Sequence, residues 1–168
     1  IDIKPLNPQA NLAKIEETVA KIVGEGLVDL VVFPALANSG YPTEGNKGPF
    51  LASAESSGGT FVTGLKKLAR QYRIHLAAGV LEEDPNSSQT AFNSGVLIDS
   101  SGEVLGWQRQ LHHLVDQDKA FFSQGDAIKV FPASLGNLSL VVGTDLEYPE
   151  VLRVQALRGA EIVCALLN

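Results

Sequence analysis

The chain has 168 residues, 45% of them hydrophobic, which is enough to bury a core and fits a single domain over residues 1–168. Its 13 Lys and Arg residues against 19 Asp and Glu residues give a net charge of −6, which disfavours binding to nucleic acids or anionic membranes, because both rely on basic patches. With Cys164 as its one cysteine and no apolar run of the roughly 18 residues that a membrane span needs, the sequence excludes an intrachain disulfide and a cysteine-rich zinc site, and we expect a cytoplasmic protein.

The N-terminal third alternates between apolar stretches and polar connections. Residues 1–6 alternate apolar and polar side chains, which predicts the end of a strand. Asn7 followed by Pro8 is typical of a helix start, and an apolar stripe at helical spacing continues until two glycines. The almost continuous apolar run 27–33 indicates a strand buried on both faces. The stretch 38–59 is rich in Gly, Ser, Asn and Pro, which predicts a long loop.

The rest of the chain continues the alternation, with some strands following one another directly. The expected elements are a helix over 61–72, strands over 74–81, 91–98, 103–109, 128–131, 138–142 and 162–167, and a helix over 149–158. Residues 82–90 and 112–126 are expected to be loops. Strands and helices that alternate in this way predict an α/β fold.

One stretch, Val141 to Glu150, has the pattern of a strand, a sharp turn and a helix start. The strand is buried, the turn falls at Gly143, and the helix begins at Pro149. Many α/β enzymes carry their nucleophile at such an elbow. A glycine has no side chain with which to attack, and this absence needs an explanation.

Three segments, in the order in which they occur, resemble the signatures of the nitrilase superfamily, the carbon-nitrogen hydrolases. They are residues 33–42, residues 106–126 and the elbow with the helix and turn that follow it, residues 143–162. The resemblance implies an α-β-β-α sandwich, in which two sheets pack face to face and helices cover the outside. A family domain usually continues for roughly another hundred residues beyond the elbow. We therefore expect this sandwich to be incomplete on its C-terminal side.

The resemblance also implies a chemistry, and the residues that would perform it are replaced. The family attacks carbon–nitrogen bonds with a cysteine, a glutamate base and a lysine that stabilises the oxyanion, with a second glutamate nearby. In this chain the base position is Ala35, the lysine position is Leu111 and the nucleophile position is Gly143. None of these side chains can act as a base, cation or nucleophile. Asp118 remains as a possible counterpart of the second glutamate.

Five side chains are candidates for an inherited pocket: Tyr41, His113, Asp118, Thr144 and Tyr148. Each of the middle three also has a purely structural interpretation. His113 can hydrogen-bond loop backbone, Asp118 can be an exposed acid beside Lys119, and the Thr144 hydroxyl can bond to nearby backbone. Two adjacent histidines with no third ligand do not make a metal site, and no cofactor is expected.

Other polar residues near the motifs are better explained by structure. Asp145 and Glu150 are expected to cap the turn and to favour the dipole of the following helix. Arg109 replaces the missing lysine only if its strand continues unbroken to Leu111. Cys164 lies in an apolar strand, where a free cysteine behaves as a small hydrophobic residue.

The leading hypothesis is a catalytically inactive domain with a binding, scaffolding or oligomerisation role. Two alternatives remain. One is an active carbon-nitrogen hydrolase whose catalytic residues have been changed or are supplied by another chain, and the codons of the natural gene at Ala35, Leu111 and Gly143 would distinguish it. The other is a small-molecule sensor that uses the inherited pocket. A homo-oligomer, or a partner segment that completes the sandwich, is expected because monomers seldom expose a large apolar sheet face.

Overall fold

The computed structural model describes residues 1–43, 45–114 and 116–168, without the side chains of Asp116 and Gln117. The expected loops 38–59 and 112–126 therefore each contain one residue, 44 and 115, that lies outside the described part. The helices are α1 (Pro8–Glu25), α2 (Lys47–Ala52), α3 (Thr60–Tyr72), α4 (Asp116–Phe121), the 3-10 helix η1 (Gly143–Glu147) and α5 (Pro149–Leu157). The strands are β1 (Leu30–Val32), β2 (His75–Glu83), β3 (Ala91–Ile98), β4 (Val104–Arg109), β5 (Phe122–Ser123), β6 (Phe131–Ala133), β7 (Gly136–Val142) and β8 (Ile162–Leu166).

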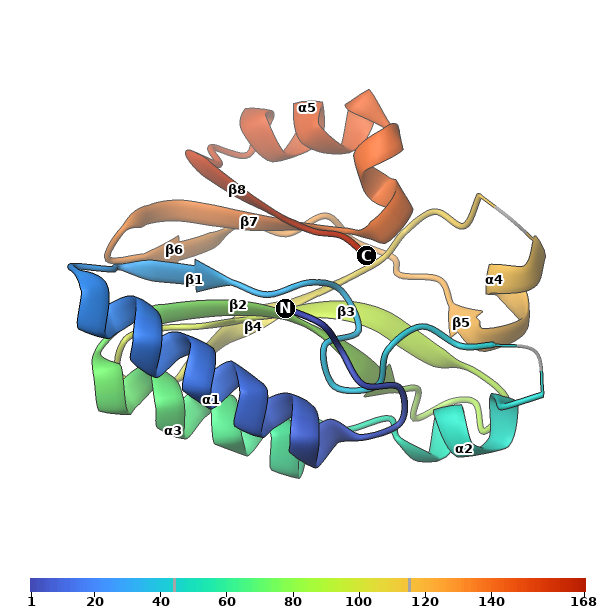
Figure 1. Ribbon diagram of the computed structural model, residues 1–168. Coiled ribbons are helices and arrows are strands. Elements are labelled where there is room, and N and C mark those ends of the chain that lie inside the picture. The colour runs from blue at the N-terminus through green and yellow to red at the C-terminus, as the bar shows by residue number, and fades with distance from the viewer. Residues whose placement is uncertain (44, 115) are drawn as a thin grey trace.

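The first sheet has the strand order β1-β2-β3-β4, with β5 paired to β3. Strand β1 runs parallel to β2, and the other neighbours along this path are antiparallel. Helices α1 and α3 cover one face of this sheet (Figure 1). Their buried faces, which include Ile15 and Leu65, pack on sheet residues such as Leu76 and Val96. This packing follows from the apolar stripes of the two helices.

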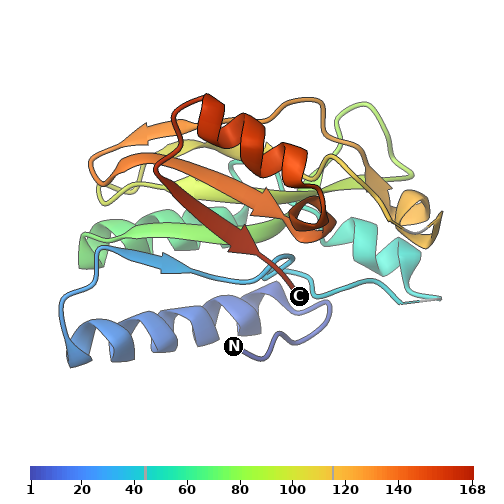
Figure 2. The same ribbon diagram turned by 90° about the horizontal axis from the view of Figure 1, so that it is seen from above.

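The second sheet, β6-β7-β8, packs against the other face of the first, and α5 covers its outer side (Figures 1 and 2). A glycine on the inner face of β3 lets the sheets approach closely, since a Cβ at Gly95 would lie 2.5 Å from Cδ1 of Leu166. The amide of Gln155 on α5 donates to the Leu140 carbonyl of β7 at 2.7 Å. The four layers are therefore α-β-β-α, and the expected α/β sandwich is confirmed.

Several expected elements are confirmed, and α1 begins where its cap predicts. The Asn7 side chain accepts a hydrogen bond from the Ala10 backbone at 3.0 Å, and Pro8 is the first helical residue. The hairpin of β3 and β4 is joined through Asp99 as expected, because the Asp99 carboxylate accepts hydrogen bonds from the Ser101 and Glu103 backbone N–H groups. The start of α1 and the β3–β4 hairpin could both be predicted because each depends on hydrogen bonds between residues close in the sequence.

The strand expected over residues 1–6 is wrong. This segment lies beside α1 and is held by individual contacts rather than by a strand partner. The Lys4 N–H donates to the Asn11 side chain at 2.8 Å, and the Leu6 N–H donates to the Ser39 carbonyl at 2.8 Å. The alternation of Ile1 and Ile3 with polar residues gave a strand-like pattern, but none of these six residues lies in a strand.

Other boundaries differ because the loops contain short elements. Helix α2 lies inside the expected loop 38–59, and α4 and β5 lie inside the expected loop 112–126. The apolar run 27–33 contains only the three-residue β1, which pairs on one side with β2. Burial on both faces is wrong for this strand, since Val32 is 41% exposed.

Among the described residues, no helix is long and apolar enough to cross a membrane. Cys164 on β8 is 4% exposed and packs between the sheets with Leu140 and Leu166. Burial raises the pKa of its thiol, which keeps the group protonated and unreactive. The expectation that Cys164 behaves as a hydrophobic residue agrees with this environment.

Candidate functional site

The elbow lies at the end of β7, where Val142 is followed by η1. Gly143 has φ +55°, a left-handed backbone conformation that favours glycine. A Cβ at this position would lie 2.9 Å from Oε1 of Gln110 and 3.3 Å from Nδ2 of Asn93. The space that a nucleophilic side chain would enter is therefore occupied by two side-chain amides.

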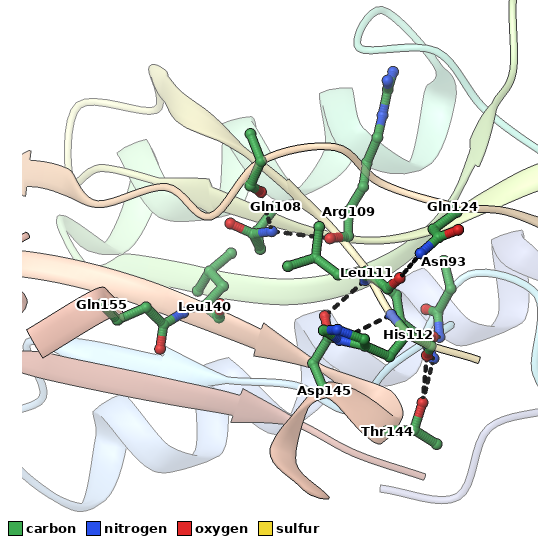
Figure 3. Close-up of polar contacts among 12 residues, drawn as sticks. Asn93, Gln108, Arg109, Leu111, His112, Gln124, Leu140, Thr144, Asp145 and Gln155 are labelled. Carbon is green, nitrogen blue, oxygen red and sulfur yellow. Dashed lines mark hydrogen bonds and ion pairs between the residues drawn. The ribbon is translucent and has the colours of Figure 1, made fainter. Parts of the chain in front are cut away.

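These amides belong to a hydrogen-bonded network between β3, β4 and the elbow (Figure 3). The Asn93 amide donates to Oε1 of Gln110 at 2.7 Å. The Gln110 amide donates in turn to the Thr144 hydroxyl and to the His112 carbonyl, both at 2.7 Å. The Thr144 hydroxyl donates to the same carbonyl at 2.6 Å. Thr144 thus makes the backbone contact of its structural interpretation, and each amide is held in one orientation.

The residue assigned to the lysine position, Leu111, does not face the elbow. Side chains alternate along a strand, so Gln110 points between the sheets while its neighbour points elsewhere. Leu111 lines a groove beside α5 with Val151 and Val154. Of Gln110 and Leu111, it is Gln110, 4% exposed, whose side chain reaches Gly143.

Arg109 lies on the opposite face of the first sheet from Gln110. Its guanidinium bonds to both Glu82 carboxylate oxygens at 2.6 and 3.0 Å and lies 3.8 Å above the Phe92 ring. Figure 3 shows the side chain pointing away from His112 and Asp145. Hydrogen bonding and charge from Glu82 raise the pKa of Arg109 despite its partial burial. Arg109 therefore does not replace the missing lysine at the elbow.

Asp145 anchors the segment after β4 to the elbow. Its carboxylate is 1% exposed and accepts hydrogen bonds from the backbone N–H groups of Leu111 at 2.8 Å and His112 at 2.9 Å. Nδ1 of His112 lies 2.8 Å from the same carboxylate, and the His112 ring stacks on Tyr148 at 4.0 Å. The cap at the turn that was expected of Asp145 is wrong, because its carboxylate accepts hydrogen bonds from these N–H groups, 34 and 33 residues away along the chain, instead.

Ala35 lies at the same end of the sandwich as the elbow. Its N–H donates to the Leu167 carbonyl at 3.2 Å, and Leu166 pairs with Val142 next to Gly143. The methyl group is 1% exposed and belongs to the core between the sheets. Gly79 permits this approach, since a Cβ there would lie 2.2 Å from Cα of Ala35.

The side chains of Tyr41 and Asp118 form a hydrogen bond near the elbow. The Tyr41 hydroxyl donates to Asp118 Oδ1 at 2.5 Å, and Asp118 is 5% exposed. Burial, followed by the contact with Asp118, raises the pKa of Tyr41. The Tyr41 ring meets Phe122 edge-on, with centroids 6.0 Å apart. Of the two interpretations of Asp118, the exposed loop acid is therefore wrong.

A cavity of about 330 Å³ lies next to this pair. It is lined by His112, His113, Lys119, Phe122, Gln124 and Tyr148. Two of the five expected pocket residues, His113 and Tyr148, line it, whereas Tyr41, Asp118 and Thr144 do not. Gln124 was not predicted to line a pocket, and no local sequence pattern identifies it as a pocket residue. In the described part of the chain, no group of three or more His, Cys, Asp or Glu side chains could hold a metal ion.

His113 presents an unsatisfied atom in this region. Burial lowers the pKa of the imidazole, so the ring is neutral near pH 7. Its Nε2 is buried and has no hydrogen-bond partner in the part of the chain that the structure describes. The interpretation of His113 as a residue that hydrogen-bonds loop backbone stays a prediction for the other ring nitrogen, Nδ1.

Comparisons with known proteins agree with the three sequence signatures. The carbon-nitrogen hydrolase family model matches residues 1–168. A probable nitrilase of Schizosaccharomyces pombe is 30% identical over 94% of this chain and 57% of its own length. A nitrilase of Pyrococcus abyssi is 30% identical over 94% of this chain and 58% of its own length.

A solved structure of similar fold is a cysteine-to-alanine mutant of the Nesterenkonia AN1 amidase from the nitrilase superfamily. It superposes with a TM-score of 0.83 at 28% identity, over 98% of this chain and 61% of the amidase chain. The chain thus spans little more than half of the length of the curated relatives named above. The family match along the whole chain, the relatives and the shared fold together show that this protein belongs to the carbon-nitrogen hydrolase family.

Proposed function

We propose that this chain is a member of the carbon-nitrogen hydrolase family that lacks the family's catalytic activity at the elbow and binds a ligand or a protein partner. The observation that carries the proposal is the elbow, where Gly143 supplies no side chain and the Gln110 amide fills the space in front of it. Ala35, at the position matching the family base, contributes only a methyl group.

The chemistry of the family depends on groups that act together. A glutamate-to-glutamine mutant of a related Nesterenkonia amidase shows covalent addition of the acetamide moiety of fluoroacetamide at its active-site cysteine. In this chain the matching position is Gly143, and the neighbouring Gln110 amide carries no positive charge to stabilise an oxyanion. The loss of one member of such a group costs about as much rate as the loss of all of them, typically about 10³-fold or more.

The purified chain is expected to hydrolyse no member of a panel of amides, nitriles and carbamoyl compounds above the rate in buffer. The same compounds should be tested for thermal stabilisation, because a ligand that binds only the folded state raises the unfolding temperature without turnover. Turnover that survives stringent purification and disappears in Asp118→Ala would overturn the proposal. Stabilisation without turnover would support the sensor role.

The cavity beside Tyr148 supports the sensor as a second candidate function. The buried Nε2 of His113 has no hydrogen-bond partner among the described residues, and an unsatisfied buried polar atom is costly. A bound molecule that forms a hydrogen bond with this nitrogen would remove that cost. The stacked rings of His112 and Tyr148 provide a flat wall for it.

A protein partner is supported by an apolar flank formed by β1 and β8, the outer strands of their sheets (Figure 2). Four large apolar side chains are exposed there, between 37% and 42%: Val32, Ile162, Val163 and Leu167. Strand β8 carries no charged residue, although exposed edge strands are usually protected by charges. We propose that a second copy or a partner segment covers this flank.

Sedimentation equilibrium is expected to show an oligomer at micromolar concentration, and Val163→Lys is expected to weaken the association at least about tenfold, because a charge opposes burial of the flank. The matched control is Gln71→Lys, which adds the same charge to the exposed side of α3 in the other outer layer. A monomeric wild-type chain, or equal effects of both substitutions, would contradict a role for this flank in self-association.

A further inference from the structure

A second cluster of reactive side chains lies at the other end of the sandwich. Ser134, in the turn between β6 and β7, has its hydroxyl 3.2 Å from Nε2 of His75, the first residue of β2. His75 is 3% exposed. Asp99 follows β3 and stands opposite His75, one step beyond the Leu76–Ile98 pair. Such cross-strand neighbours have Cβ atoms about 5 Å apart on the same face of the sheet.

The three side chains share one cavity. It has a volume of about 460 Å³ and is lined by His75, Asp99, Ser100, Leu105, Pro132, Ala133 and Ser134. The seven-residue strand β7 separates this end from Gly143, a separation of about 20 Å. Figure 1 shows the β6–β7 turn at the opposite end of β7 from η1. This cavity is therefore distinct from the candidate site at the elbow.

Asp99 is fixed as a negative charge beside the imidazole. Its Oδ1 accepts hydrogen bonds from the Ser101 N–H at 2.8 Å, the Ser101 hydroxyl at 2.7 Å and the Glu103 N–H at 3.0 Å. Partial burial opposes the charged form, but these hydrogen bonds and the nearby His75 outweigh it and lower the pKa of Asp99. The carboxylate thus remains ionised at neutral pH and stabilises a positive charge on His75.

A histidine nitrogen beside a serine hydroxyl is the contact that activates a hydroxyl nucleophile, and a nearby carboxylate stabilises the imidazolium that forms. We propose that this cavity is a second reactive site, in which Ser134 accepts the acyl group of small activated carboxylic esters. His75 is the general base, and Asp99 is a positioning residue that acts through the imidazole. Serine hydroxyls in turns are otherwise weak nucleophiles, so the contact with Nε2 is the essential feature.

The proposed reaction has two balanced steps. The Ser134 Oγ attacks the ester carbonyl carbon while Nε2 of His75 takes the hydroxyl proton, and the carbon–oxygen bond to the alcohol then breaks. The alcohol leaves as its anion or takes the proton from His75. Water attacks the acyl-serine in the second step, so that the carboxylic acid is released and the Ser134 hydroxyl is restored.

The walls of the cavity indicate which esters fit. Leu105, Pro132 and Ala133 present short apolar surfaces next to the Ser134 hydroxyl. Among the described residues, no lysine or arginine lines the cavity, so no cationic side chain of the lining attracts an anionic acyl group. We therefore expect uncharged acetyl and butyryl esters to react, and succinyl esters of the same alcohol to react more slowly.

The test uses p-nitrophenyl acetate and a fluorophosphonate, which phosphonylates an activated serine with release of fluoride. Mass spectrometry of digested protein should locate the fluorophosphonate adduct at Ser134, and Ser134→Ala should abolish it. His75→Gln should slow labelling at least about 100-fold, the usual contribution of a general base. The matched control is Ser100→Ala, which removes a hydroxyl from the same cavity and is expected to label at the wild-type rate.

The pH dependence provides a second measurement, because His75 is buried and His75→Gln can destabilise the fold. In the wild-type chain the labelling rate should rise as an imidazole loses its proton and then become constant. Ser134 is exposed in its turn, so Ser134→Ala should fold normally. Absence of an adduct at Ser134, equal labelling in the two serine variants, or a rate without histidine-like pH dependence would overturn the proposal.

Discussion

Asp145→Ala is expected to lower the free energy of unfolding by about 3 kcal/mol or more, because a buried N–H group that loses its acceptor costs about 1 to 3 kcal/mol. The substitution leaves the N–H groups of Leu111 and His112 without the carboxylate that they contact at 2.8 and 2.9 Å. It also frees the His112 ring from the contact that holds it against Tyr148. Urea unfolding followed by circular dichroism measures the change.

The matched control for this prediction is Glu147→Ala in the same 3-10 helix. Glu147 is exposed, and surface substitutions of this kind usually change stability by less than about 0.5 kcal/mol. Asp145→Asn keeps one acceptor oxygen and should fall between the two. Equal stabilities of Asp145→Ala and Glu147→Ala would show that the carboxylate does not anchor the segment after β4.

Restoring the family's catalytic groups is expected to succeed only when the lysine replaces Gln110. A chain with Ala35→Glu, Gln110→Lys and Gly143→Cys should form a thioester at position 143 with p-nitrophenyl acetate. The matched arm carries Leu111→Lys in place of Gln110→Lys. Because Gln110 reaches the elbow and Leu111 lines the groove beside α5, the first arm should react at least about 100-fold faster.

Both arms of this experiment are best made in a Ser134→Ala background, so that adducts at the second cavity do not contribute. Intact mass and peptide mapping report the amount and position of the thioester. The cysteine has to adopt the φ of +55° that Gly143 has, at a cost of about 1 to 2 kcal/mol. A faster reaction in the Leu111→Lys arm would restore Leu111 as the lysine position, and two inert arms would show that the pocket no longer accepts an acyl group.

The elements that sequence predicted well are those with local chemical causes. Helix α1 follows from Asn7 and Pro8, and the β3–β4 hairpin follows from the hydrogen bonds of Asp99. Helix α2 lies in a stretch whose Gly and Pro content argues against a helix, and it packs through Phe50 against Phe121 and Phe122. Those two aromatic residues are far away in sequence, so local propensity could not reveal the packing that stabilises α2.

The candidate site also depends on contacts between residues that are distant in the sequence, which sequence patterns do not reveal. The adjacent histidines His112 and His113 allow the second signature to be placed in two ways, one residue apart. A shift of one residue in a strand sends a side chain to the other face. Only the contact of Gln110 with Asn93, which lies on the neighbouring strand, shows which side chain faces the elbow. The hydrogen-bond donors to Asp145 could not be predicted either, because Leu111 and His112 are far from Asp145 in the sequence.

The amide network around Gly143 restricts which mutations the protein can accept at that position. A single mutation that places a side chain at position 143 meets Oε1 of Gln110 at 2.9 Å and adopts a left-handed backbone conformation, so it is destabilising before it can be useful. On the proposal that the elbow is non-catalytic, a return to the family reaction needs changes at Gly143, Gln110 and Ala35 together. We expect descendants of this chain to diverge in what they bind rather than to regain the ancestral reaction.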